Sequence, residues 1–380
     1  MKDEYQLESK TVEWLRFACI FLVVIIHTMS NTVILKPLLF CKLGVDINPK
    51  SLLTILLGEG LCKIAVPIFF LISGYYFFTG LQSWKAEVYT QKLKNRFHSL
   101  FIPYIVWNLI ALIFCLLNES IPNDSFSVNS YISEHGWFRI FWDNNFIESS
   151  TFTNILGQSM HQSYPLNIPL WFLRDLMLVN IMSPIVYYAN RYFAKPFLLL
   201  LSFLFIFGIS FQSLAGFTTA AFFFSLGAFF RINGKCMLSE FRKHSVWLYI
   251  LTIILYVASV LIYGGNPVIQ RIIHNLFILS GMMSAFCLSS GLIERGRLNV
   301  NGYLANASFF IFLSHGILLY ITAKHVEHLF SLIFEKYAVI YVLSMPFIIT
   351  GICLIIYFVM DRWTPGTLSF LTGKRTQKRY

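Results

Sequence analysis

The amino-acid sequence predicts an all-α polytopic membrane protein with about ten transmembrane helices and both termini in the cytoplasm. Three observations predict this class: the composition, the long apolar segments and the placement of Lys and Arg. Hydrophobic residues make up 57% of the 380-residue chain and charged residues 12%, and the mean hydropathy is +0.66. Soluble proteins carry about 25% charged residues, so this chain has too few to cover a water-exposed surface.

Ten apolar segments have the length and composition expected of membrane spans. They lie at residues 12–33, 53–78, 98–117, 168–189, 197–213, 217–232, 246–263, 269–291, 303–321 and 337–360. The first segment is too long for the apolar part of a signal peptide, and no small-residue cleavage site follows it. We therefore expect an uncleaved first helix.

Lys and Arg are distributed unequally between the segments that connect these spans. With the N-terminus inside, the predicted cytoplasmic segments hold 20 Lys and Arg residues, and the predicted external segments hold 7. This bias follows the positive-inside rule and places both termini in the cytoplasm. The net charge of +11 is therefore explained by topology, and nucleic-acid binding is not expected.

The chain is predicted to form one transmembrane domain, residues 1–362, followed by a basic cytoplasmic tail, residues 363–380. The longest hydrophilic segment, about 118–167, is predicted to lie outside. It contains Trp137 and Trp142, which suit stacking on sugar rings, although an ordinary surface loop has the same composition. The cysteines are odd in number and have no CxxC spacing, so we expect neither a disulfide framework nor a metal site.

The first span contains "RFACIFLVVIIH", with Arg16 at one end and His27 at the other. Eleven residues are three helical turns plus about 20°, so both side chains lie on one face, about 16 Å apart along the axis. Ionisable residues inside spans are costly and usually mark function. Alternatively, Arg16 is an anchor that reaches the membrane interface, and His27 is a neutral ring buried against a carbonyl.

The second span contains "AVPIFFLISGYYFF". Pro67 predicts a kink, and the Ser73-Gly74 pair permits close approach of another helix. Glu59 and Lys63 are four residues apart on this helix, so they either neutralise each other or belong to a polar site.

Past this span comes the basic segment "KLKNRFHSLFIPY". Lys92, Lys94 and Arg96 are predicted to project from the cytoplasmic end of the third helix. Positive-inside charge is enough to explain them. They also suit a cradle for the phosphates of an anionic cytosolic cofactor.

The fourth span opens with "PLWFLRDLM". Arg174 and Asp175 are predicted to lie about 9 Å inside the outer boundary. Adjacent helical residues point about 100° apart, so we expect no simple pair within the helix, and each side chain needs a partner elsewhere or a water-filled cavity. His315, in "SFFIFLSHGILLY" of the ninth span, lies at a depth similar to that of His27. The two histidines therefore predict a shared polar cavity.

Together these motifs resemble the acyltransferase-3 family of integral membrane acyltransferases. The matching features are the Arg16-to-His27 spacing, "PIFFLISGYYFF", "KLKNRFHSLFIPY", "LWFLRDLM" and "SFFIFLSHGILL". Glu13 stands where many relatives have an acid before "LR". The resemblance runs from about residue 11 to 360, and the order and spacing of the motifs carry it.

The resemblance implies transfer of an acyl group, most often acetyl, from cytosolic acyl-CoA to a hydroxyl of a cell-surface polysaccharide or lipid-linked glycan. It implies a bacterial plasma (inner) membrane protein whose partners are acyl-CoA, the glycan and the lipid bilayer, without a metal. His27 becomes the general base, with Arg16 as its basic partner and Glu13 beside it. The implied donor-binding residues are Arg16, Lys94, Arg96, Ser73, Gly74 and Tyr75. The candidates for holding the acceptor or the oxyanion are Trp171, Arg174, Asp175, His315, Glu59 and Lys63.

Three alternatives stay open at this point. The protein is a transporter or flippase for a glycan or small solute, since buried charges and broken helices occur there too. It is a membrane scaffold whose polar residues serve packing. Or it is an acyltransferase that transfers succinyl and not acetyl.

Overall fold

The computed structural model describes residues 2–30, 52–81, 83–119, 133, 136–142, 151–153, 159–161, 163–210 and 216–374, and almost all of them are helical. The helices are α1 (Lys2–Ser30), η1 (Thr54–Gly60), η2 (Leu61–Ile64), α3 (Ala65–Phe77), α4 (Ala86–Arg96), η3 (Phe97–Phe101), α5 (Ile102–Glu119), α7 (Phe138–Trp142), η4 (Ile168–Leu170), α8 (Trp171–Ile181), α9 (Ser183–Tyr192), α10 (Ala194–Ile206), α11 (Phe217–Ile232), α12 (Met237–Arg242), α13 (Ser245–Leu261), α14 (Pro267–Glu294), α15 (Gly302–Trp363) and α16 (Pro365–Leu371). Two short strands, β1 (Thr151–Thr153) and β2 (Ser159–His161), pair antiparallel with Thr151 opposite His161.

All ten predicted spans fall on helices, but they differ in length. Within the described residues, six helices are long and apolar enough to cross a membrane, and a bent pair, Ile168–Ile181 with Ser183–Tyr192, makes a seventh. Three more apolar helices, α10, α11 and α13, have only 10–17 residues. A helix rises about 1.5 Å per residue, and the hydrocarbon core is about 30 Å thick. A polytopic helical membrane protein is confirmed, whereas ten complete spans and the orientation stay predictions.

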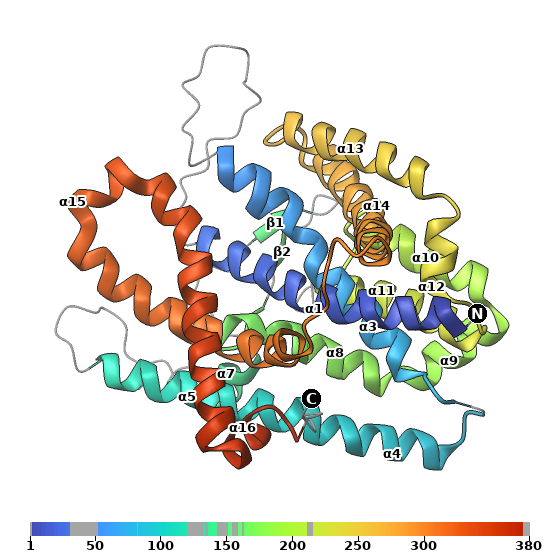
Figure 1. Ribbon diagram of the computed structural model, residues 1–380, viewed down its shortest axis with the longest axis horizontal. Coiled ribbons are helices and arrows are strands. Elements are labelled where there is room, and N and C mark those ends of the chain that lie inside the picture. The colour runs from blue at the N-terminus through green and yellow to red at the C-terminus, as the bar shows by residue number, and fades with distance from the viewer. Residues whose placement is uncertain are drawn as a thin grey trace.

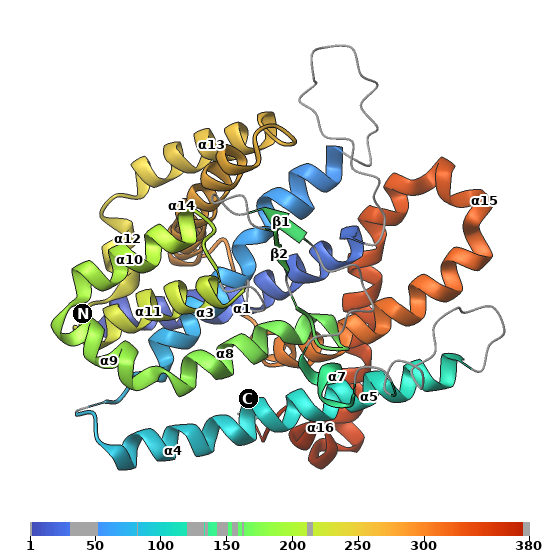
Figure 2. The same ribbon diagram turned by 180° about the vertical axis from the view of Figure 1, so that it is seen from behind.

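α1 lies at the centre of the molecule and contacts α3, α14 and α15 (Figure 1). α15 leaves this centre, turns back on itself and returns, so its two ends provide the ninth and tenth predicted segments (Figure 1). α4, η3 and α5 follow one another along one edge, and α16 packs on α5 (Figures 1 and 2). The basic residues predicted at the end of the third helix therefore lie on one continuous helix, Ala86–Leu117.

The closest helix pair is α3 with α11, and glycine makes it possible. A Cβ atom on Gly74 would lie 2.0 Å from the carbonyl oxygen of Phe224, and one on Gly227 would lie 2.0 Å from that of Leu71. Small residues allow helix backbones to meet in membranes, where van der Waals packing replaces the hydrophobic effect. The expected close approach at Ser73-Gly74 is confirmed.

Two spans are irregular for reasons that the sequence explains. The second begins as a π-helix, Thr54–Gly60, continues as a 3₁₀-helix, Leu61–Ile64, and becomes α-helical at Ala65. Pro67 has no N–H for the carbonyl of residue 63, so the irregular turn lies directly before it, as the proline predicts. α8 and α9 meet at 61°, with a proline in the first turn of α9.

Candidate functional site

A cavity of about 460 Å³ lies among α1, α3, η3, α8, α15 and the chain end that follows α16. Arg16 and Arg96 are the charged side chains among the described residues that line it. The Arg16 guanidinium lies 5.9 Å from the centre of the Tyr76 ring, and the Arg96 guanidinium 5.5 Å from that of Phe77. Arg16 is exposed to solvent, so these two cations form a basic mouth, defined here as Arg16 and Arg96.

The structure keeps two of the three basic residues that the sequence grouped close together and separates the third. The Lys92 ammonium and the Arg96 guanidinium lie 5.2 and 5.5 Å from the centre of the same Phe77 ring. Arg96 lines the cavity. Lys92 instead donates a hydrogen bond of 2.5 Å to the carbonyl of Phe77. Lys94 is exposed and is not a lining residue. On a helix of 3.6 residues per turn, residues 92 and 96 share one face and residue 94 points to the opposite side.

The donor residues proposed on the second span are separated in the same way. Ser73 and Tyr76 line the cavity. Gly74 faces α11, and Tyr75 is 2% exposed with its ring centre 5.6 Å from the guanidinium of Arg231. Gly74 and Tyr75 therefore belong to helix packing on another face of α3. Tyr76, which the sequence analysis did not select, lies at the cavity.

The inner end of the cavity is formed by three phenylalanines on three helices, which we call the throat: Phe69, Phe172 and Phe312. The Phe69 and Phe172 ring centres are 6.0 Å apart, and those of Phe172 and Phe312 are 5.5 Å apart. On α3, Phe69 lies two turns from Tyr76 at the basic mouth. The cavity thus runs from guanidinium groups to aromatic rings.

His27 and His315 meet directly beyond the throat. Their ring centres are 5.3 Å apart, and the ring of His315 lies 6.2 Å from that of Phe312. His315 is fully buried, and His27 is partly buried. The sequence predicted similar depth for the two histidines, and the structure brings them into contact.

The hydrogen bonding of His315 fixes its tautomer. Its Nδ1 lies 2.9 Å from the carbonyl oxygen of Ile311. A carbonyl only accepts, so Nδ1 carries the proton and Nε2 carries a lone pair. Nε2 is buried and has no hydrogen-bond partner among the described residues. The histidine pair therefore contains a nitrogen that is ready to accept a proton.

Glu59 and Lys63 pair with each other at 3.4 Å, as their spacing predicted. Lys63 also acts electrostatically on His27 and on His274. Glu59 and His274 line a second cavity of about 250 Å³ between η1, α13 and α14. Lys63, Glu59 and His274 thus form a row of ionisable groups between the histidine pair and the second cavity.

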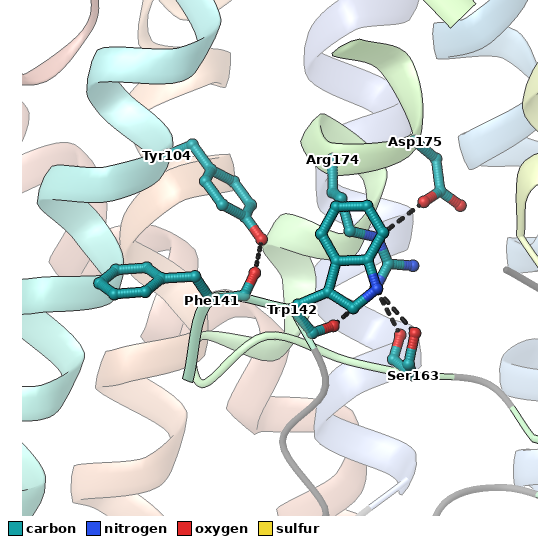
Figure 3. A network of polar contacts seen from close by, with 6 residues as sticks. All are labelled: Tyr104, Phe141, Trp142, Ser163, Arg174 and Asp175. Atoms are coloured by element: carbon teal, nitrogen blue, oxygen red, sulfur yellow. Dashed lines mark hydrogen bonds and ion pairs between the residues drawn. The ribbon is translucent and has the colours of Figure 1, made fainter. Parts of the chain in front are cut away.

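Arg174 and Asp175 correct one expectation. The Arg174 Nε donates to Asp175 Oδ1 at 2.9 Å, although neighbouring helical residues point apart (Figure 3). The long arginine side chain crosses the angle between them. The pair is 2% and 0% exposed, so the expectation that each needs a partner elsewhere is wrong in part.

The other contacts of Arg174 are with the predicted external segment. Its Nη1 donates to the Trp142 carbonyl at 2.9 Å and to the carbonyl and hydroxyl of Ser163 at 3.1 and 2.9 Å (Figure 3). The guanidinium also lies 5.3 Å from the Trp142 ring centre. Arg174 therefore holds the middle of the predicted external segment, at Trp142, and its C-terminal part, at Ser163, against α8. Most of segment 118–167 lies outside the described residues.

The remaining predicted residues are placed as follows. The Trp171 and Phe70 ring centres are 6.4 Å apart. The Trp171 ring and the Asp175 carboxylate also pack against Gly216, where an added Cβ would lie 2.5 Å from each. Glu13 is partly buried and forms no ion pair within the described part of the chain. The structure does not bring either residue to the histidine pair.

Asn167 is, like Tyr76, a residue that the sequence motifs did not indicate. Its side-chain nitrogen donates to the carbonyl of Leu313 at 3.0 Å, and its backbone N–H donates to Asn108 Oδ1 at 3.0 Å. A Cβ on Gly316 would lie 2.7 Å from Asn167 Oδ1. Asn167 thus holds the start of η4 against α15 beside His315. Buried asparagines next to a span are a signal that could have found it.

Comparison with known proteins places these features in context. A family model described as an acyltransferase domain matches residues 10–358. The chain is 26% identical over 337 residues to the succinoglycan biosynthesis protein ExoH of Rhizobium meliloti (strain 1021), covering 85% of this chain and 82% of the relative. No solved structure gives a significant match.

Proposed function

Because the chain belongs to the acyltransferase-3 family, we propose that it transfers an acyl group from acyl-CoA to a hydroxyl of a cell-surface polysaccharide or lipid-linked glycan. Its similarity to a succinoglycan biosynthesis protein supports an exopolysaccharide as acceptor. The proposed setting is the plasma membrane of a bacterium. The donor approaches from the cytoplasm, where the positive-inside rule puts Arg16 and Arg96.

One observation carries the proposal: a single cavity connects a basic mouth to an apolar inner end that borders a histidine pair. Guanidinium groups bind phosphates well, because they offer paired N–H donors and a permanent charge. CoA presents its phosphates at one end and the thioester at the end of a long arm. The cavity likewise has its cations at one end and its apolar rings at the other.

The proposed reaction needs a base and a path for one proton. The acceptor hydroxyl oxygen attacks the thioester carbonyl carbon, a C–O bond forms, and the C–S bond breaks. His27 takes the hydroxyl proton, and the lone pair on His315 Nε2 lets the histidine pair hold that proton. The histidine pair then gives this proton to the departing CoA thiolate, so that charge and atoms balance and the base is restored.

Acetyl is the acyl group that we propose, because the described residues lining the inner end of the cavity offer no cation to a carboxylate. An unpaired charge in an apolar site is costly. A succinyl group would carry such a charge past the throat.

The proposal is tested by mass spectrometry of surface glycans from cells that express the wild type, His27→Ala, Arg16→Ala or the partly exposed control Glu240→Gln. We expect the acetyl mass increment to disappear in the first two variants and to persist in the control, with the glycan still exported. Normal acetylation in His27→Ala would remove the catalytic assignment. Loss of the whole polymer from the surface would indicate a transporter.

Donor binding is tested separately on purified protein. Arg96 lines the cavity, whereas Lys94, two residues earlier, is exposed. Arg96→Gln should weaken CoA binding in a salt-dependent way, and Lys94→Gln is the matched control that should not. Equal effects of the two substitutions would contradict a phosphate site at the basic mouth.

A further inference from the structure

We propose that the throat, Phe69, Phe172 and Phe312, sets the size of the acyl group that reaches the histidine pair. This inference rests on the proposed acyl transfer from CoA. The throat is a specificity-determining element, and it is separate from the residues that bind the phosphates or accept the proton.

The position of the throat follows from three helices that reach the same level. On α3, the lining residues run from Tyr76 through Ser73 and Ile72 to Phe69. On α15 they run from Ala305 to Phe312, and on α8 the pair is Leu176 and Phe172. The last lining residue on each helix is a phenylalanine.

The three rings form a connected barrier. Phe172 lies 6.0 Å from Phe69 at 61° and 5.5 Å from Phe312 at 72° between ring centres, both edge-to-face arrangements. Such contacts stabilise each pair beyond simple burial. Phe172 also lies 4.4 Å from Phe70, which is fully buried. The Phe172 ring is therefore packed against a buried ring and has little room to move away from the cavity.

The throat borders the histidines. Phe312 precedes His315 by three residues on α15, and their ring centres are 6.2 Å apart. A thioester that enters from the basic mouth has its acyl group in front, because the acyl group is the terminal part of the donor. The acyl group must therefore pass the throat before its carbonyl carbon comes within reach of His27 and His315.

The chemistry of this passage favours a small uncharged group. The lining residues next to the throat, Ile72 and Leu176, are apolar. Packed interiors resist added volume, because side chains must leave their preferred rotamers. A methyl group needs little displacement of the rings, whereas each further methylene needs more.

The experiment measures how acyl-CoA molecules of different size compete with labelled CoA for the purified full-length protein. The ligands are CoA, acetyl-CoA, butyryl-CoA and succinyl-CoA. The variants are Phe69→Leu, Phe172→Leu and Phe312→Leu, which keep an apolar side chain while removing ring volume. Phe203→Leu is the matched control, because Phe203 is 48% exposed on the outside of α10.

For the wild type we expect butyryl-CoA to bind at least about 10-fold more weakly than acetyl-CoA, since a single methylene changes discrimination by about 10- to 200-fold. Each throat variant should reduce this ratio several-fold, and Phe203→Leu should not. Phe312→Trp should act in the opposite sense, weakening acetyl-CoA while leaving CoA unchanged.

An unchanged butyryl-to-acetyl ratio in all three throat variants would overturn the inference, even if CoA binds normally. Absence of CoA binding to the wild type would instead overturn the proposed function itself, and the throat's role with it. The Phe312→Trp variant keeps the test decisive where a leucine variant loses its fold, because each result is compared with CoA binding by the same preparation.

Discussion

His315 combines two properties that act at the scale of one residue. Its Nδ1–H bond to the Ile311 carbonyl fixes the ring on α15, and its Nε2 is left with a lone pair beside His27. A buried nitrogen without a partner is costly in a protein interior. The lone pair on His315 Nε2 suits a nitrogen that accepts a hydrogen bond or a proton during the reaction.

His315→Asn separates these two properties, because an asparagine amide can still donate to the Ile311 carbonyl but offers no basic nitrogen. We expect acyl transfer to fall by about 10²–10⁴-fold, the usual contribution of a positioned base, with thermal stability unchanged. The measurement is glycan acetylation beside a thermal unfolding curve. His244→Asn, at an exposed position, serves as control, and wild-type transfer by His315→Asn would exclude a role in proton handling.

The buried contacts of Arg174 predict that it contributes to stability. Its substitution by Gln leaves the Asp175 carboxylate buried and frees Trp142 and Ser163. Breaking one side of a buried pair costs about 3–5 kcal/mol, so we expect a clear fall in unfolding temperature. Arg242→Gln removes an exposed partner of Glu294 and should cost under about 1 kcal/mol. Similar unfolding temperatures for the two variants would contradict the anchoring role.

At the scale of elements, α3 divides its motif between two faces. Ser73 and Tyr76 look into the cavity, whereas Gly74 meets the backbone of α11. One contiguous sequence motif therefore serves both the site and the packing that supports it.

Gly74→Ala should destabilise the protein by about 1–3 kcal/mol or more, because the added Cβ meets a backbone carbonyl that no rotamer change can move. Gly351→Ala is the matched control, since a Cβ there has open space. The measurement is the unfolding temperature together with CoA affinity of the folded fraction. A stable Gly74→Ala protein that loses CoA binding would indicate instead that Gly74 contributes to donor binding.

The sequence predicted the elements well, and the contacts between them only in part. Hydropathy located the apolar helices, because apolar length is a local property of the chain, but six or seven of the ten predicted segments are long enough to span a membrane within the described residues. Helical periodicity placed Glu59 beside Lys63 correctly. It failed for Arg174 and Asp175, because a long flexible side chain is not bound to the direction of its Cα–Cβ bond. The throat could not be predicted, since phenylalanine is abundant here and only tertiary packing selects three of the rings.

At the scale of the whole molecule, the orientation in the membrane is the assumption on which the direction of transfer depends. α14 tests it, because it runs from Pro267 to Glu294 with exposed residues at both ends. In a variant without the native cysteines, Pro267→Cys should react with a membrane-impermeant maleimide in intact cells. Arg295→Cys should react only after permeabilisation, and the reverse pattern would place the basic mouth outside.

The aromatic throat also bears on the electrical potential across the membrane. An enzyme with the proposed route from a cytoplasmic donor to an external acceptor must not let ions cross the membrane, where each charge that crosses releases about 2.3 kcal/mol per 100 mV. Phe172 contacts both Phe69 and Phe312, and apolar rings offer hydrated ions and water chains no hydrogen-bond partner. The phenylalanines that are proposed to limit the size of the acyl group would then also limit ion leakage. Throat variants with smaller side chains should therefore increase the proton permeability of the membrane.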